Sequence, residues 1–460
     1  MSITADTADR TLLIIALLGV GICFALLARR VPRVGVLLWF ISVCFVPYWA
    51  GVGIGPYWPP TTVIGLLLIF SAAKIRAPRL TSWDFAVFAF GTIAYVAYAI
   101  DVVTLSEMFV VLAVWIVPFV GGRVVASRVS ITWIYGTVAI AFTIVAVLAV
   151  IEFLTGQNLF ASIRISNPAY ESWAPLQYRG GSLRAEGAFG HSIALGASIA
   201  LAVPLVMAAP FRVWIRTVMV LLMLAAVVVT FSRVGMICAV LALVLSILFL
   251  REEVPRKLRV ALVVSGGIVA VGAYSLVVGV FTAAGSEATA SASYRGDLTS
   301  LISQFNLLGL TGVYQKNAQG EVFFGDFHSI DSALILAGLT YGVIALAIIV
   351  VVLIGASIAV LRRRATPATI AIVAQIPAFA TVALITQYAA FVWFIGGLAV
   401  STQLMLPRMR AAAATAAASD SPGLVSRRHK VPSIAPGTLA RRVSTTSTRS
   451  SPRGTNNGTS

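Results

Sequence analysis

The feature that most constrains this chain is its succession of long apolar runs, about thirteen in number. A run of roughly 17 to 25 apolar residues can cross a bilayer as a helix, because a helix satisfies its own backbone hydrogen bonds. Hydrophobic residues make up 59% of the 460 residues and charged residues 11%, whereas a soluble domain is about 45–50% apolar. The sequence therefore predicts an all-α, polytopic integral membrane protein with about 12–13 transmembrane helices.

Two polar interruptions divide the membrane domain, which we expect to cover residues 1–406. The apolar runs begin near residues 11, 34, 61, 83, 108, 131, 191, 217, 234, 258 and 332, with a final pair in residues 369–406. Residues 153–190 and 282–331 separate groups of runs and have the polar composition of loops. We expect the second of these loops to carry short helices.

Basic residues are concentrated in alternate loops, which predicts the orientation. Lysine and arginine resist translocation and mark the cytoplasmic side. The basic loops contain Arg29, Arg30, Arg33, Lys74, Arg76, Arg79, Arg123, Arg128, Arg212, Arg216, Arg251, Arg256, Lys257, Arg259, Arg362, Arg363 and Arg364. We therefore expect a multi-pass protein of the cell (cytoplasmic) membrane, with the loops of residues 153–190 and 282–331 on the external face.

Residues 407–460 differ from the rest in composition. They are rich in Ala, Ser, Thr, Pro and Arg and show no helical or strand periodicity. We expect a disordered, basic cytoplasmic tail. No aromatic residues accompany its arginines, which argues against nucleic acid as a partner. Adhesion to anionic headgroups of membrane lipids is one interpretation, and a solubilising tail is the other.

Arginine within an apolar run is costly, and Arg233 in TFSRVGM interrupts the run from Val218 to Leu250. A tight turn from Phe231 to Val234 would divide this run into two short spans and place Arg233 just below the outer surface. Its guanidinium could then reach the lipid headgroups, or it could point inward and hold an anion.

Two further polar segments carry charged residues expected on the external face. RGGSLRAEGAFGHSIALG contains Arg184, Glu186 and His191 before a helix of small residues. Arg184 and Glu186 could form a surface ion pair, and His191 could cap the helix; the alternative is that all three support a binding site. SYRGDLTSLI presents Arg295. Because guanidinium groups bind phosphate oxygens through paired donors, an outward-facing arginine set suits a phosphorylated lipid substrate.

The segment GDFHSIDSALILAGLTYG places His328 and Asp331 at the start of an apolar run. Histidine titrates near neutrality and can accept a proton from a hydroxyl group. Asp331 could instead cap the following helix. Gly338 and Gly342 form a small-residue face suited to close packing. The sequence contains no phosphate-binding P-loop, dinucleotide fingerprint, HExxH or paired-cysteine metal motif.

The order of these motifs resembles the O-antigen ligase and O-antigen polymerase superfamily, the membrane glycosyltransferases of polysaccharide assembly. The resemblance covers roughly residues 180–342. It comprises Arg184 with GAFGHSIALG, TFSR ending at Arg233, YRGD with Arg295, and HSIDSALILAGLTYG. The chain departs from the family in one respect: counting back from the late glycine, Asp331 with Ser332 stands where the family has a His-Asn pair. His328 lies three residues upstream, so either residue could be the base.

The resemblance implies transfer or polymerisation of glycan from a polyprenyl-pyrophosphate-linked donor to a glycan or lipid acceptor. Exopolysaccharide or another cell-surface polysaccharide would be the product. Arg233, Arg295 and Arg184 would bind the pyrophosphate, His328 or Asp331 would deprotonate the acceptor, and His191 and Glu186 would support the site. The reaction would invert the anomeric centre and use no metal or other cofactor. A chain-length regulator and other polysaccharide-assembly proteins are further candidate partners.

Two alternatives remain open at the level of sequence. Within the enzyme class, a ligase and a polymerase are not distinguished. The Ala, Val and Arg richness suggests a GC-rich genome, and because some bacteria with such genomes lack lipopolysaccharide, it favours polymerase. Outside it, a membrane transporter or lipid-linked glycan flippase is the rival. Transporters commonly carry acidic residues at the membrane midplane and internal repeats, whereas Asp84, Asp101, Glu107 and Glu152 fall near the ends of apolar runs.

Overall fold

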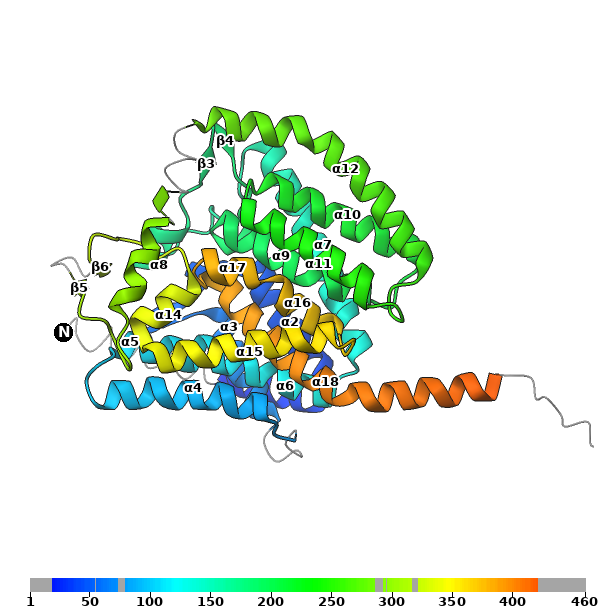
Figure 1. Cartoon of the computed structure of the whole chain (residues 1–460), viewed down its shortest axis with the longest axis horizontal. Helices are drawn as coiled ribbons and strands as arrows, with labels where there is room; N and C mark the ends of the chain where they lie inside the picture. The colour runs from blue at the N-terminus through cyan, green and yellow to red at the C-terminus, as the bar shows by residue number, and fades with distance from the viewer. Residues whose placement is uncertain are drawn as a thin grey trace, which may run out of the picture. The chain divides into compact units, whose positions relative to one another are not determined.

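The computed structural model describes residues 19–53, 55–72, 79–285, 293–294, 296–316 and 322–420, with side chains up to residue 407 (Figure 1). The described chain is almost entirely helical, which confirms the all-α class. Its strands form three short antiparallel hairpins: β1 (Val52–Gly53) with β2 (Tyr57–Trp58), β3 (Tyr178–Arg179) with β4 (Ser182–Leu183), and β5 (Tyr314–Lys316) with β6 (Val322–Phe324). Arg295, one of the candidate arginines, lies outside the described residues.

Five segments of the described chain are long and apolar enough to cross a membrane. They are Leu105–Arg128 (α5 Leu105–Phe109, η2 Val110–Ile116 and α6 Val117–Arg128), α7 (Ile131–Thr155), α12 (Arg256–Ala283), α15 (Val343–Leu361) and Thr386–Pro407 of α18 (Thr386–Asp420). Shorter apolar helices are α2 (Pro32–Phe45), α3 (Pro60–Ser71), α9 (Ser192–Met207), α10 (Val213–Val229), α11 (Arg233–Phe249), and α16 (Pro367–Ala374) with α17 (Ile376–Thr381). The remaining named helices are α4 (Ser82–Ala99), α8 (Pro168–Trp173), α14 (Ala333–Tyr341) and the 3-10 turns η1 (Tyr48–Ala50), η3 (Gly187–Phe189) and η4 (Leu298–Gln304).

The apolar run that begins near residue 332 is not one continuous helix. Gly342 separates α14 from α15 and has a φ of 88°, a conformation that favours glycine. A Cβ at this position would lie 2.6 Å from the carbonyl oxygen of Leu307, and one at Gly338 would lie 2.5 Å from the ring of Phe305. The two glycines therefore let the segment of residues 305–308 pack directly against the α14–α15 break.

Helix α9 lies at the centre of the main core and packs against α7, α10, α11 and α16 (Figure 1). All of its residues except Ile193 are buried. Small residues allow this close packing: a Cβ at Gly196 would lie 3.0 Å from Thr230 Oγ1, and one at Gly235 of α11 would lie 3.1 Å from the backbone of Gly196. In contrast, α12 packs outside α10, and most of its apolar side chains are exposed, as expected of a surface in lipid.

Several of the basic loops meet at one end of the helices. A pocket there is lined by the end of α11, residues 251–253, residues 362–364 after α15, and Leu406 of α18. Arg216, near the start of α10, donates to the carbonyl oxygen of Glu253 at 3.1 Å. Because α11 and α15 both end here, the start of α11 lies toward the opposite end, and so does α14, which precedes α15 (Figure 1).

A buried ion pair joins α4, α6 and α18. Arg123 and Asp84 are 4% and 1% exposed, and Arg123 Nε lies 2.8 Å from Asp84 Oδ1. Arg123 also donates to Ser401 Oγ at 2.9 Å and to the carbonyl oxygen of Arg79. Asp84 completes a capping box by accepting from the backbone N–H of Thr81 at 2.7 Å. Asp84 and Arg123 therefore have a structural role inside apolar helices, because each compensates the buried charge of the other.

Candidate functional site

The expected tight turn at Arg233 is present and joins two antiparallel helices. α10 ends at Val229 and α11 begins at Arg233, with Phe231 at a φ of 46° in the turn. Ser232 caps α11 by accepting from the backbone N–H of Gly235 at 3.1 Å. Thr230, Phe231 and Ser232 are buried, whereas Arg233 is exposed. The turn therefore fixes the backbone and leaves the Arg233 guanidinium accessible.

A second arginine reaches the same turn from the β3–β4 hairpin. Arg179 Nη1 donates to the carbonyl oxygen of Phe231 at 2.8 Å. The ring of Phe281, near the end of α12, lies under both guanidinium groups, with its centroid 4.4 Å from Arg233 Cζ and 5.4 Å from Arg179 Cζ. Cation–π contacts of this kind favour a fixed guanidinium position. Phe281 thus holds two positive charges side by side at one end of the helices.

Arg184 follows the hairpin and lies beneath the turn. It is 7% exposed, and its Nε donates to the carbonyl oxygen of Thr230 at 3.1 Å. The backbone is joined here as well, because the N–H of Ala185 donates to the carbonyl oxygen of Val229 at 3.1 Å. Three arginines, Arg179, Arg184 and Arg233, are therefore gathered around one turn. We call them the arginine cluster.

Gly180 allows the hairpin to dock where it does. Its φ is 52°, and a Cβ would lie 2.6 Å from the carbonyl oxygen of Val280 and 3.1 Å from the Cβ of Ala283. The neighbouring Gly181 also has a positive φ, 76°, but faces open space. Only Gly180 is thus required by contact with α12, and this contact places Arg179 beside Phe281.

Two buried carboxyl groups lie behind the arginine cluster. Glu152, at the end of α7, accepts from Asn158 Nδ2 at 2.9 Å and from the backbone N–H groups of Glu186 and Gly187 at 3.0 and 2.9 Å. Glu186 is 1% exposed and accepts from the backbone N–H of Gln177 at 2.8 Å. Burial, more than the nearby charge of Glu152, raises the pKa of Glu186 to about 8. The interpretation of Arg184 and Glu186 as a surface ion pair is wrong, since both side chains are buried.

His191 is the N-cap of α9. Its Nδ1 accepts from the backbone N–H of Ile193 at 3.2 Å, and its ring packs edge-on against Trp173 at 6.2 Å. Burial, together with the positive charge of Arg184, lowers the pKa of His191 to about 4. The helix-cap interpretation is therefore confirmed, and His191 is neutral at physiological pH.

The segment from His328 to Asp331 lies next to η4 and the β5–β6 hairpin. His328 is exposed, and its ring packs against Phe323 at 4.4 Å. Asp331 accepts from Ser329 Oγ at 3.2 Å. The capping role expected of Asp331 belongs to Ser332, whose Oγ accepts from the backbone N–H of Ile335 at 3.2 Å. Both His328 and Asp331 thus keep side-chain atoms available for chemistry.

The YRGD segment contacts this same region through Tyr294, the residue before Arg295. The Tyr294 hydroxyl donates to the carbonyl oxygen of Ser329, which stands between His328 and Asp331. Its ring packs against Phe327 at 5.5 Å, and burial raises the pKa of the phenol. The motifs containing Arg295 and His328 are therefore adjacent.

The candidate residues fall into two groups at one end of the helices. The arginine cluster with Glu186 and His191 forms the first, and His328 and Asp331 with Tyr294 form the second; the hydrogen bonds and ring contacts described above stay within each group. Arg179, Glu152 and Asn158 belong to the first group but were not among the predicted site residues. The Gly-Gly pair after Arg179 is the pattern of a tight hairpin, but the sequence does not show that this hairpin docks against Phe281 of α12.

Within the described ranges, no group of three or more His, Cys, Asp or Glu residues could hold a metal ion. The chain matches no family model, no curated protein and no solved structure.

Proposed function

We propose that this protein transfers or polymerises glycan from a polyprenyl-pyrophosphate-linked donor at the external face of the membrane. The observation that carries the proposal is the arginine cluster: three guanidinium groups around the turn of residues 229–233, at the end of the helices away from the basic loops. Such an arrangement suits a pyrophosphate at a membrane surface, because paired guanidinium donors match phosphate oxygens. The positive-inside rule assigns the basic loops to the cytoplasm and this end to the outside.

The arginine cluster suits both binding and catalysis. As the acceptor oxygen attacks the anomeric carbon, the bond to the pyrophosphate breaks and negative charge grows on the departing group. Arg233 is exposed and held over Phe281, so it can contact that group directly, whereas buried Arg184 contributes charge from below. Donors fixed before the reaction stabilise such charge most effectively.

The proton of the acceptor hydroxyl requires a base at the same face. His328 and Asp331 are the candidates, because His328 is exposed and Asp331 is half-buried, and they stand beside the YRGD segment. Direct displacement with His328 or Asp331 as base would invert the anomeric centre. The acceptor would be a glycan, for a polymerase, or a lipid, for a ligase.

The direct test uses the full-length protein in liposomes with polyprenyl-pyrophosphate-linked glycan isolated from the host. We expect release of free polyprenyl pyrophosphate together with a new glycosidic bond. Arg233→Ala should lower the rate by about 10²–10³. Arg212→Ala is the matched control, since Arg212 is also an exposed arginine at a helix start but lies at the start of α10, at the other end.

The transporter or flippase alternative predicts a different product. A flippase would move the lipid-linked glycan between leaflets and leave the glycan bound to its lipid. Leaflet exchange of intact donor without release of polyprenyl pyrophosphate would refute glycan transfer. If glycan transfer is observed instead, the transfer rates of His328→Ala and Asp331→Asn, measured separately, would identify the base.

A further inference from the structure

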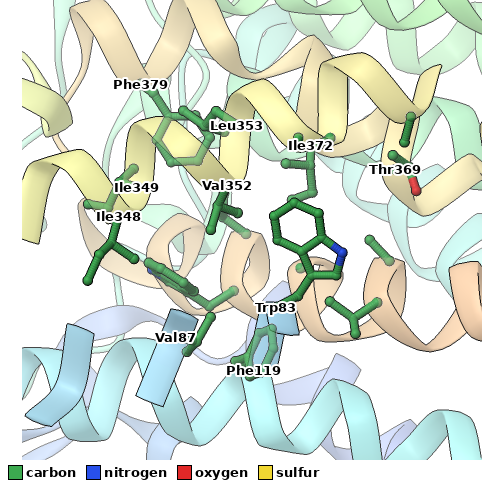
Figure 2. A pocket seen from close by; sticks show the side chains of 18 of the residues that line it. Trp83, Val87, Phe119, Ile348, Ile349, Val352, Leu353, Thr369, Ile372 and Phe379 are labelled. Atoms are coloured by element: carbon green, nitrogen blue, oxygen red, sulfur yellow. The ribbon is translucent and has the colours of Figure 1, made fainter. Parts of the chain in front are cut away.

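A largely apolar cavity lies away from the arginine cluster, between α4, α15, α16 and α18. Its volume is about 370 Å³. Figure 2 shows Trp83 and Val87 of α4 on one side and Ile348, Ile349 and Val352 of α15 on the other. None of the arginine cluster lines it, and neither does His328 or Asp331.

The cavity follows the long axis of α15. The residues of α15 that line it recur at helical spacing from Ile348 through Val352 and Ala359 to Arg362 beyond the helix end. At about 1.5 Å per residue this stretch is roughly 20 Å long, which is more than the ~15 Å depth of one leaflet of the hydrocarbon core. Its length and its largely apolar lining suit an extended hydrocarbon chain.

The polarity of the lining changes along this axis. Aromatic and aliphatic side chains line most of it, whereas the polar lining residues Arg362, Arg364, Thr369 and Gln403 are all at the end of α15. Both arginines are exposed. Gln403 is oriented by hydrogen bonds to the carbonyl oxygen of Arg364 at 2.7 Å and to Thr369 Oγ1 at 2.8 Å. The cavity is therefore amphipathic, with positive charge at one end only.

We infer that this cavity binds an anionic phospholipid, with an acyl chain along α15 and the headgroup phosphate at Arg362 and Arg364. Charge complementarity selects this occupant, because guanidinium groups bind phosphate oxygens and anionic lipids gather at basic segments next to membrane helices. The headgroup lies at the end where the basic loops meet, opposite the arginine cluster. The site is thus separate from the proposed site of glycan transfer and does not depend on it.

The test uses the detergent-purified full chain, titrated with phosphatidylglycerol or phosphatidylcholine and analysed by native mass spectrometry. We expect one tightly bound phosphatidylglycerol and weaker binding of phosphatidylcholine. The double variant Arg362→Ala with Arg364→Ala should weaken phosphatidylglycerol binding about 25-fold, since each basic residue near an anionic lipid contributes about a fivefold factor. The control double variant Arg212→Ala with Arg256→Ala removes two exposed arginines that do not line the cavity and should bind as the wild type does.

A second pair of variants tests the apolar part. Ala359→Trp fills the cavity with a large side chain, whereas Val351→Trp places the same side chain at an exposed position of α15 that does not line it. We expect Ala359→Trp alone to abolish tight binding, with both variants monodisperse in gel filtration. Unchanged binding by Ala359→Trp would overturn the inference and indicate adhesion to the basic surface only. Equal affinity for the two lipids, or a polyprenyl phosphate as the lipid retained in place of phospholipid, would also overturn it.

Discussion

Glu186 provides the sharpest test of the buried carboxyl groups behind the arginine cluster. Its side chain is 1% exposed, and burial raises its pKa from an ordinary value near 4.5 to about 8. Below pH 4.5 the carboxyl group is protonated in both the folded and the unfolded chain. As the pH rises from 4.5 to 8, the unfolded chain loses this proton while the folded chain keeps it, so folding stability falls.

The size of this effect follows from the pKa. The loss of stability is complete above about pH 8, where the folded chain also loses the proton. Each tenfold change in proton affinity corresponds to about 1.4 kcal/mol, so the total loss is on the order of 5 kcal/mol. Glu186→Gln cannot ionise and should escape this loss. The glutamine oxygen can still accept from the backbone N–H of Gln177, as Glu186 does at 2.8 Å. The variant should therefore gain stability over the wild type as the pH rises.

Thermal unfolding of the detergent-purified protein between pH 5 and 9 measures this difference. We expect the midpoint of Glu186→Gln to exceed that of the wild type by about 5–10 °C at pH 9 and by little at pH 5. Glu171→Gln is the matched control, because Glu171 lies in the same loop and is exposed. If the difference in unfolding midpoint between the wild type and Glu186→Gln is constant across this pH range, Glu186 does not titrate as a buried acid and the reasoning fails.

Three further predictions concern single positions. Gly180→Ala should reduce glycan transfer far more than Gly181→Ala. An alanine at either position would carry backbone strain of about 1–2 kcal/mol, but only the Cβ at position 180 would collide with Val280; transfer rates in liposomes compare the two variants. Arg123→Ala should cost about 3–5 kcal/mol because it leaves buried Asp84 unpaired, whereas the half-buried Arg128→Ala should cost less; thermal midpoints decide. Ser332→Ala should cost about 1 kcal/mol as a lost N-cap, and Asp331→Ala should leave the midpoint nearly unchanged; a larger loss for Asp331→Ala would return the capping role to Asp331.

Much of the fold could be predicted because the signals are local. Apolar runs of helical length fix the class, and a charged residue inside such a run predicts an interruption, as the turn at Arg233 confirms. The break at Gly342 was not predicted, since apolar composition continues through it. It depends on contact with Leu307, and such contact between separate segments leaves no mark on the hydropathy.

The arginine cluster shows the same division. Arg233 and Arg184 could be selected from their immediate sequence, one by its cost in an apolar run and the other by the glycines that follow it. Arg179 could not, because its place depends on docking of the hairpin against Phe281 and Val280 of α12. The environment of Glu186 was also beyond the sequence: charged residues usually lie at the surface, and only the folded chain shows that this one is buried.

The buried carboxyl groups also bear on how the arginine cluster would hold a pyrophosphate. An ionised Glu186 would offset part of the charge of Arg184, whose positive charge in turn lowers the pKa of Glu186. A neutral Glu186 leaves that charge directed at the anion. Bound pyrophosphate would stabilise the protonated form further, since like charges repel. Donor binding and proton uptake by Glu186 are then linked. Donor affinity of the wild type should fall as the pH rises past about 8, whereas Glu186→Gln, which cannot ionise at this position, should lack this fall.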